Sequence, residues 1–202
     1  ERKTEVIPFD HEFNAEDFYP DDPVVITISH MGYIKRTPLT EFHEQSRGGA
    51  GAKAARHRDN DFTEYIYPAT MHNTLLFFTQ KGRCYWQKCY EIPEGDKNSK
   101  GRAIQNLLNI EPDDAINAVL RVKNFGDEEF LQSHNVMFAT KNGIIKKTCL
   151  KEYSRPRTNG VIAINILEDD RVVGVRLTNG NNEIILANRN GRAIRFNEHD
   201  VR

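Results

Sequence analysis

The chain has 202 residues, with 28 Lys or Arg against 29 Asp or Glu, so its formal net charge is −1. Hydrophobic residues make up 38% of it, and no apolar run approaches the ~18 residues that a membrane-spanning helix needs. Its content of Val, Ile, Leu and Phe excludes a disordered chain, and its three cysteines cannot form a disulfide framework. Because no signal segment follows Glu1, we expect a soluble, cytoplasmic piece of a larger chain.

One pattern occurs four times along the chain: an apolar run, a turn with glycine, and a short strand with basic residues. The turn glycines are Gly32, Gly82, Gly143 and Gly191. The apolar runs cover residues 25–28, 75–79, 136–140 and 184–187, and the basic strands cover residues 33–36, 83–86, 144–147 and 192–195. Val, Ile, Phe, Tyr and Thr are frequent in these segments, which favours β-strands.

Two further markers recur in phase with the turn glycines. A second glycine follows each of the first three by 17, 19 and 17 residues: Gly49, Gly101 and Gly160. An acidic turn comes next, at residues 59–61, 111–114 and 168–170, and a new apolar strand begins after each turn. Four strands per ~50 residues are typical of propeller-like blades. We therefore predict one all-β repeat domain over residues 1–202, with approximate blades 1–58, 59–110, 111–168 and 169–202, the last incomplete.

Charge alternates in register with this repeat. The segments that contain the basic residues of each basic strand and of the loop after it are positive: residues 35–58 carry a net charge of +4, 79–102 of +3, 141–160 of +5 and 189–202 of +2. Equivalent positions of a blade array fall on one rim, so we expect a basic stripe along one edge, with the acidic turns elsewhere. Such a stripe is an electrostatic track for a phosphate backbone. The alternative is that Lys and Arg only keep edge strands soluble.

A glycine-rich segment, residues 45–53, lies between the first basic strand and the next strand. It is not a phosphate-binding loop of the G-x-x-x-x-G-K-[ST] type, because the chain has no Gly-Lys pair. With residues 27–41, 75–82, 90–109, 146–166 and 172–196, it gives the chain a close resemblance to the C-terminal domain of the DNA gyrase A subunit. That family carries the box Q-R-R-G-G-K-G. Here the corresponding residues are Gln45, Ser46, Arg47, Gly48, Gly49, Ala50 and Gly51, so Ser46 and Ala50 replace two basic residues of the box.

The resemblance implies a β-pinwheel, a propeller-like disc of four-stranded antiparallel blades that exchange strands. About four of the family's usual six blades are present, so the ring is expected to be incomplete. It also implies that duplex DNA wraps around a basic rim, which supports ATP-dependent negative supercoiling by the whole enzyme. In the family, the box is the determinant of wrapping and supports ring closure.

The resemblance further implies that the cleavage and ATPase sites lie elsewhere in the enzyme. We expect no catalytic residue, no metal and no cofactor in this domain, while the whole enzyme uses ATP and Mg. The implied partners are duplex DNA, the rest of the gyrase A subunit and the gyrase B subunit in a heterotetramer. The implied location is the bacterial cytoplasm at the nucleoid, without a membrane, and the isolated domain is expected to be monomeric.

The candidate DNA contacts are the basic residues in and after the turns, where they would position the phosphate backbone without reading sequence. They are Lys35, Arg36, Arg47, Lys53, Arg56, Arg58, Lys81, Arg83, Lys88, Lys100, Arg102, Lys146, Lys147, Arg155, Arg157, Arg189, Arg192 and Arg195. Because a strand alternates its faces, only some of them can point to the rim. The equivalent positions Ile34, Cys84, Ile145 and Ala193 are expected to be core.

Several other features point away from catalysis or metal binding. The histidines show no close ligand pair, and Cys84 and Cys89 lack the second pair that a zinc site needs. The carboxylates of the acidic turns are expected to be solvated, and Trp86 to pack rather than to stack on DNA. Two other interpretations stay open. One is the equivalent domain of the topoisomerase IV A subunit, and the other is a propeller-like scaffold for protein interactions.

Overall fold

The computed structural model describes residues 15–42 and 60–201, and the fold is reported for these residues. The strands are β1 (Pro23–Ser29), β2 (Tyr33–Pro38), β3 (Thr63–Thr70), β4 (Thr74–Thr79), β5 (Arg83–Lys88), β6 (Arg102–Ala103), β7 (Ile116–Val122), β8 (Asn135–Thr140), β9 (Ile145–Cys149), β10 (Val161–Ile162), β11 (Val172–Thr178), β12 (Glu183–Ala187) and β13 (Ala193–Asn197). The α-helix is α1 (Glu128–Ser133). The 3-10 helices are η1 (Ala15–Phe18), η2 (Leu39–Glu41), η3 (Cys89–Glu91), η4 (Ile104–Asn106), η5 (Leu150–Tyr153) and η6 (Glu198–Asp200).

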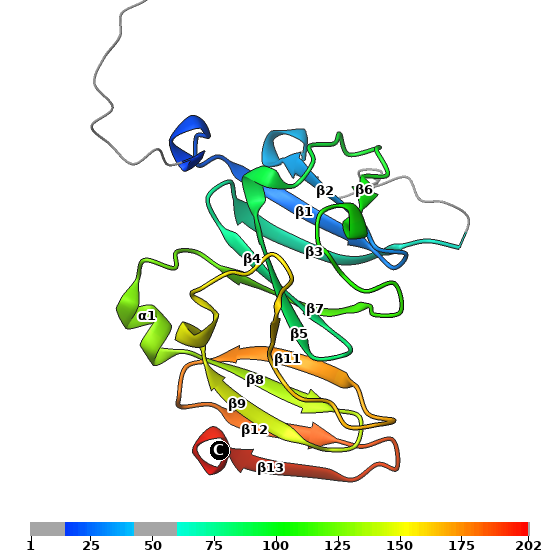
Figure 1. The fold of residues 1–202 in the computed structure, drawn as a ribbon, viewed down its shortest axis with the longest axis vertical. Helices are drawn as coiled ribbons and strands as arrows, with labels where there is room; N and C mark the ends of the chain where they lie inside the picture. The colour runs from blue at the N-terminus through cyan, green and yellow to red at the C-terminus, as the bar shows by residue number, and fades with distance from the viewer. Residues whose placement is uncertain (1–14, 43–59, 202) are drawn as a thin grey trace, which may run out of the picture.

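The strands form four antiparallel sheets that follow one another along the longest axis of the molecule (Figure 1). The first sheet has the order β3-β1-β2-β6, and the second has the order β10-β5-β4-β7. Within the described residues the third sheet, β11-β8-β9, has three strands and the fourth, β12-β13, has two. The first and fourth sheets lie at opposite ends of the axis, so this part of the chain is an open array of sheets (Figure 1). The predicted all-β fold of about four antiparallel blades in an incomplete ring is confirmed, whereas the blade boundaries stay a prediction.

Each sheet is built around a hairpin whose turn contains one of the predicted glycines. Gly32, Gly82, Gly143 and Gly191 have φ angles of 78°, 82°, 89° and 77°. These angles lie in the left-handed region, which glycine adopts without the steric cost that a Cβ brings. The recurrence of this residue in the sequence therefore marks the tight turn of every hairpin.

The second glycine of a repeat lies where that repeat contacts the hairpin before it. β6 follows Gly101 and pairs with β2, and β10 follows Gly160 and pairs with β5. A Cβ on Gly101 would lie 2.5 Å from the carbonyl oxygen of Ile34, and one on Gly160 would lie 2.8 Å from that of Cys84. Only glycine lets the backbone approach so closely. The first two sheets therefore receive their outermost strand from the next repeat.

Two hydrophobic clusters hold the first three sheets together, and strand β4 contributes to both. Leu75 and Phe77 belong to the cluster between the first and second sheets, while Leu76 and Phe78 belong to the cluster between the second and third. Successive side chains of a strand point to opposite faces, so a strand buried on both faces is apolar throughout. This explains why the run of residues 75–78 is continuous rather than alternating.

The expected core position two residues after the turn glycine is fully buried only where a further strand pairs with the basic strand. Ile34 and Cys84 are fully buried, and their strands pair with β6 and β10. Ile145 is half-buried and Ala193 is exposed, because no short strand pairs with β9 or β13 in the described part of the chain. The core prediction is therefore confirmed for the first two hairpins and wrong for Ala193.

The acidic turns have a structural role that their sequence pattern does not predict. In each, one carboxylate accepts a hydrogen bond from the amide that precedes the turn glycine of the preceding hairpin: Asp61 from Met31 at 3.0 Å, Asp114 from Lys81 at 3.1 Å and Asp170 from Asn142 at 3.0 Å. The same carboxylate oxygen also accepts from the amide that follows the aspartate itself. These three carboxylates therefore stabilise the hairpin turns instead of being simply solvated.

Candidate nucleic-acid interface

The topology separates an inner and an outer edge of the sheets. The strands β7 and β11 lie side by side, and the Tyr65 hydroxyl on β3 donates to the carbonyl of Asn117 on β7 at 3.0 Å. The edges formed by β3, β7 and β11 therefore converge. The opposite edges, formed by β6 in the first sheet and β10 in the second, face outward.

Exposed cations lie on these outer edges and on the segments that lead into them. Lys100 and Arg102 flank Gly101 at the outer edge of the first sheet, and Arg155 and Arg157 lie just before β10. Their side chains make no hydrogen bond or ion pair with the residues that the structure describes. An unpaired, exposed cation can take up a phosphate without first breaking a protein contact.

A third group of cations surrounds the turn of the fourth hairpin. Lys141, Arg189 and Arg192 line a groove of about 600 Å³ between the third and fourth hairpins, together with apolar residues such as Val173 and Ile194. Arg189 and Arg192 are among the contacts predicted from the sequence, whereas Lys141 is not. Lys141 stands two residues before its turn glycine, as Arg189 does, so comparison of these repeat positions could have found it. Arg195 is exposed, but its guanidinium pairs with Glu183 at 3.0 Å.

Lys35 is not at the surface, and its predicted role is corrected. Its side chain is 2% exposed, and its ammonium donates to the carbonyls of Asp96, Lys97 and Ser99 at 2.9, 3.0 and 3.0 Å. Burial lowers the pKa of Lys35 because it disfavours the charged form, while Asp96 and Glu41 act in the opposite direction. Lys35 therefore anchors the segment before β6 and cannot reach DNA.

Three more predicted contacts bind main-chain carbonyls. Arg36 donates to the carbonyl of Ile92 at 3.1 Å and pairs with Glu94 at 3.1 Å. The ammonium groups of Lys146 and Lys147 donate to the carbonyls of Ala163 and Glu198: the two distances are 2.7 and 2.8 Å. These side chains are buried or half-buried and hold neighbouring segments of the protein together.

The acidic turns do not all lie apart from the basic segments, which corrects that part of the charge prediction. Lys81 pairs with Glu111 at 3.0 Å and with Asp113 at 2.6 Å. The hydrogen bonds from Lys81 to Asp113 and to Glu111 raise the pKa of its ammonium.

Two more of the predicted cations have protein partners. Lys88 pairs with Glu16, and the guanidinium of Arg83 donates to the carbonyl of Asn159 at 2.6 Å. The remaining predicted residues, Arg47, Lys53, Arg56, Arg58 and the box residues Gln45, Ser46, Gly48, Gly49, Ala50 and Gly51, lie outside the described residues.

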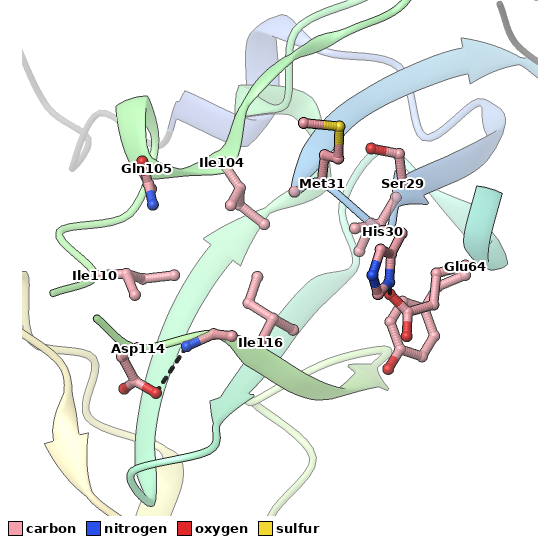
Figure 2. A pocket seen from close by; sticks show the side chains of 13 residues that line it. Ser29, His30, Met31, Glu64, Ile104, Gln105, Ile110, Asp114 and Ile116 are labelled. Carbon is pink, nitrogen blue, oxygen red and sulfur yellow. Dashed lines mark hydrogen bonds and ion pairs between the residues drawn. The ribbon is translucent and has the colours of Figure 1, made fainter. Parts of the chain in front are cut away.

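A pocket between the first two sheets is a poor site for an anion. It has a volume of about 160 Å³ and lies beside the turn of the first hairpin (Figure 2). Its lining contains the carboxylates of Glu64 and Asp114 but, among the described residues, no Lys or Arg. Figure 2 shows Glu64 beside His30, to which it pairs at 3.2 Å, and Asp114 bonded to a backbone amide. The lining of this pocket therefore offers an anion no cationic partner among the described residues.

Two cysteines and the tryptophan in or beside the second basic strand have structural roles. Burial raises the pKa of the Cys84 thiol, and it raises that of Cys89 to about 12. The indole of Trp86 donates to the carbonyl of Tyr153 at 2.7 Å, which confirms the predicted packing role. In the described ranges no group of three His, Cys, Asp or Glu residues could hold a metal ion. No helix within these ranges is long and apolar enough to cross a membrane.

The repeated hairpins, the exchanged short strands and the exposed cations define a propeller-like repeat domain with a basic outer edge. A profile described as the DNA gyrase C-terminal domain, beta-propeller, matches residues 23–69, 73–123, 134–179 and 182–202. The chain belongs to this family.

Comparison with known proteins gives the same family. The chain is similar to the DNA gyrase A subunit of Salmonella typhimurium, with 42% identity over 202 residues that cover 100% of this chain and 22% of that protein. It is also similar to the DNA gyrase A subunit of Clostridium acetobutylicum, with 44% identity over 202 residues that cover 100% of this chain and 24% of that protein. The chain thus spans less than a quarter of the length of these relatives.

Solved structures of two C-terminal domains share the fold. The crystal structure of the C-terminal domain of DNA topoisomerase IV has a TM-score of 0.74 and 30% identity, over 91% of this chain and 54% of that one. A structure of the DNA gyrase A C-terminal domain has a TM-score of 0.68 and 23% identity, over 90% of this chain and 56% of that one. Both are similar in fold to the open array described above.

Proposed function

We propose that this domain binds duplex DNA along its outer edge and wraps it, and that it thereby supports ATP-dependent negative supercoiling by a gyrase. One observation carries the proposal: seven exposed cations whose side chains have no partner among the described residues lie on the outer edges of the first two sheets and at the turns of the third and fourth hairpins. They are Lys100, Arg102, Lys141, Arg155, Arg157, Arg189 and Arg192. Lys97, Lys123 and Arg171 also have no side-chain partner in the described part of the chain, and Lys123 follows β7 while Arg171 precedes β11, so such cations are concentrated on the outer edge without being confined to it. Lys35, Arg36, Lys146 and Lys147 instead donate to carbonyls.

The physical basis is the balance between bending and phosphate contacts. Bending 20–30 base pairs costs of order 1–6 kcal/mol, and a longer wrap costs more. Contacts to phosphates offset this cost through the release of counterions, and they carry no sequence information. An edge with cations on successive sheets supplies such contacts along a curved path. Binding is therefore expected to tolerate any sequence and to weaken steeply with salt.

The proposal is tested by the salt dependence of binding to a duplex of about 30 base pairs. Arg155→Gln/Arg157→Gln is expected to lower the slope of log K against log salt by about 2, because about one unit is lost per phosphate contact. Lys151→Gln is the matched control, because Lys151 is exposed but pairs with Glu128 at 2.7 Å. A slope that is the same in the double variant as in the wild type would contradict a role of these arginines.

The whole protein is proposed to be the A subunit of a DNA gyrase in the bacterial cytoplasm, assembled with a B subunit that supplies ATP hydrolysis. Identity to gyrase subunits over the whole chain supports this proposal. A second candidate is the A subunit of topoisomerase IV, which the similarity to a topoisomerase IV C-terminal domain favours. Relaxed plasmid distinguishes them: the full-length protein with its ATP-hydrolysing partner and ATP should introduce negative supercoils if it is a gyrase.

A further inference from the structure

One position in the basic strands makes a side-chain contact across each boundary between sheets. It is the fourth residue after the turn glycine, and it is occupied by Arg36, Trp86 and Lys147 in the first three hairpins. Each of these residues donates to a main-chain carbonyl in or directly after the 3-10 helix that follows the next hairpin: Arg36 to Ile92 at 3.1 Å, Trp86 to Tyr153 at 2.7 Å and Lys147 to Glu198 at 2.8 Å. We call these three side chains the inter-sheet donors.

The inter-sheet donors share an N–H group and little else. One is a guanidinium, one an indole and one an ammonium, so a requirement for positive charge does not explain the position. The carbonyls of Ile92 and Tyr153 lie at the carboxyl ends of short helices, where carbonyls lack intrahelical partners, whereas the Glu198 carbonyl lies at the start of η6 and also accepts from the Val201 amide at 3.2 Å. In the fourth hairpin the position is Arg195, and there the guanidinium turns back to Glu183 of its own hairpin. Across the first three boundaries, the shared contact is therefore a donor that reaches the next repeat.

The inter-sheet donors are one of several hydrogen-bonded attachments between consecutive repeats. At the first boundary the amide of Arg36 also donates to the Pro93 carbonyl, and the amide of Gly95 donates to the Arg36 carbonyl, at 2.9 Å each. Another attachment is at the turns of the first two hairpins, where the amides of Ile104 and Ala163, which directly follow β6 and β10, each donate at 2.8 Å to the carbonyl of a turn glycine, Gly32 or Gly82. The donor stands four residues further along the strand, at about 13 Å from the turn. The hydrophobic contacts between the sheets are non-directional and fix no angle by themselves. Two hydrogen-bonded points at a separation of this size restrict rotation of one sheet on the next.

We propose that Arg36, Trp86 and Lys147 are positioning residues that set the angle between consecutive sheets, and with it the curvature of the path offered to DNA. The angle is a property of the protein alone, whereas its effect on DNA rests on the proposed function. Arg36 and Lys147, predicted from the sequence as DNA contacts, thus act on DNA through the protein. Trp86, which carries no charge, belongs to the same set.

The angle is measured without DNA, as the distance between spin labels on the full 202-residue chain. Ile66 on β3 and Ile185 on β12 are exposed and lie on the first and fourth sheets, so their distance accumulates changes at all three boundaries. The labels are attached to introduced cysteines in a Cys149→Ser background, because Cys84 and Cys89 are buried.

The variants remove or restore one donor. Trp86→Phe keeps a ring but loses the N–H, and Lys147→Met keeps the stem but loses the ammonium. Trp86→Arg places the donor of the first hairpin in the second and should restore the wild-type distance. Lys151→Met has the same change of charge as Lys147→Met at an exposed site and should leave the distance unchanged. An unchanged distance in both folded donor variants would overturn the proposal.

The effect on DNA is measured as energy transfer between the labelled ends of a duplex at saturating protein. Trp86→Phe is expected to lower the transfer while its Kd stays within about twofold of the wild type, because no phosphate contact is lost. A fall in affinity with unchanged transfer in the bound state would overturn the curvature part of the proposal. Failure of the wild-type chain to bind DNA would refute the proposed function. The distance between the spin labels would still show whether the inter-sheet donors set the angle between sheets.

Discussion

Two lysines of the same repeat domain show how position decides the use of a charge. Lys35 is buried and its ammonium binds three carbonyls, whereas Lys100 is exposed and has no partner among the described residues. Both lie in segments that the sequence marks as basic. The sequence predicts that charge gathers near the turns, but it cannot predict which carbonyls the fold brings within reach of a given side chain.

Glu198 is a second residue whose role depends on the fold. It follows its turn glycine by seven residues, where the second and third repeats have the buried residues Cys89 and Leu150. Its carboxylate is buried and accepts hydrogen bonds from the amides of Gly180 and Asn182, at 3.0 Å each. This carboxylate fastens the turn after β11 to the end of the fourth hairpin.

Replacement of Glu198 by Gln should destabilise the chain by about 2 kcal/mol at pH 7, because hydrogen bonds to a charged group are lost. Burial tends to raise the pKa of Glu198, but the hydrogen bonds, that from the Asn182 amide foremost, bring it below the ordinary value of 4.5. The stabilisation is therefore fully present above pH 4.5 and is lost as the pH falls through the lowered pKa. Urea unfolding at about pH 7 and about pH 3 measures this, and an equal difference between Glu198→Gln and wild type at both values would contradict it.

At the scale of elements, the recurring glycines predict more than turns. The four turn glycines and the strands around them could be predicted from spacing and residue type. The second glycines could also be found from their spacing, but their role could not, because it depends on the contact of one repeat with the hairpin before it. The exposure of Ala193 could not be predicted for the same reason. Burial at its position requires a strand from another repeat, and the spacing of residues does not reveal that contact.

Gly160→Ala should destabilise the fold more than Gly143→Ala. Both residues have positive φ, 68° and 89°, so either alanine costs roughly 1–2 kcal/mol in backbone strain. No described atom lies within 4 Å of a Cβ on Gly143, whereas a Cβ on Gly160 would meet the Cys84 carbonyl at 2.8 Å. Displacement of the short strand should therefore add about 1–3 kcal/mol for Gly160→Ala. The difference between the two urea midpoints measures this addition, and equal midpoints would show that the strand adapts at no cost.

At the scale of the whole molecule, the distribution of charge matters more than its sum. A net charge of −1 gives no hint of a polyanionic partner. The fold sorts many of the charges: Asp61, Asp114 and Asp170 stabilise turns, Lys35, Arg36, Lys146 and Lys147 bind carbonyls, and a group of exposed cations lies on the outer edge. The net charges of successive segments predict that a basic edge exists. Which residues belong to that edge depends on the contacts that the fold creates.

Curvature also belongs to this scale, because it accumulates over successive boundaries between sheets. The described sheets form an open array whose ends lie far apart along the longest axis (Figure 1). DNA that follows the outer edges of such an array must bend, and the cations on each sheet would hold it there. If the chain bound DNA without bending it, the cations would hold phosphates without imposing the curvature of the sheets on the duplex.

The central claim is that the outer edge bends duplex DNA. It is tested most directly by energy transfer between the two ends of a linear duplex of about 150 base pairs, one persistence length, titrated with the chain at several salt concentrations. We predict a rise in transfer that disappears as salt increases and that Arg155→Gln/Arg157→Gln weakens. Binding with no rise in transfer at any salt concentration would contradict wrapping, and no binding even at low salt would contradict the DNA interface itself.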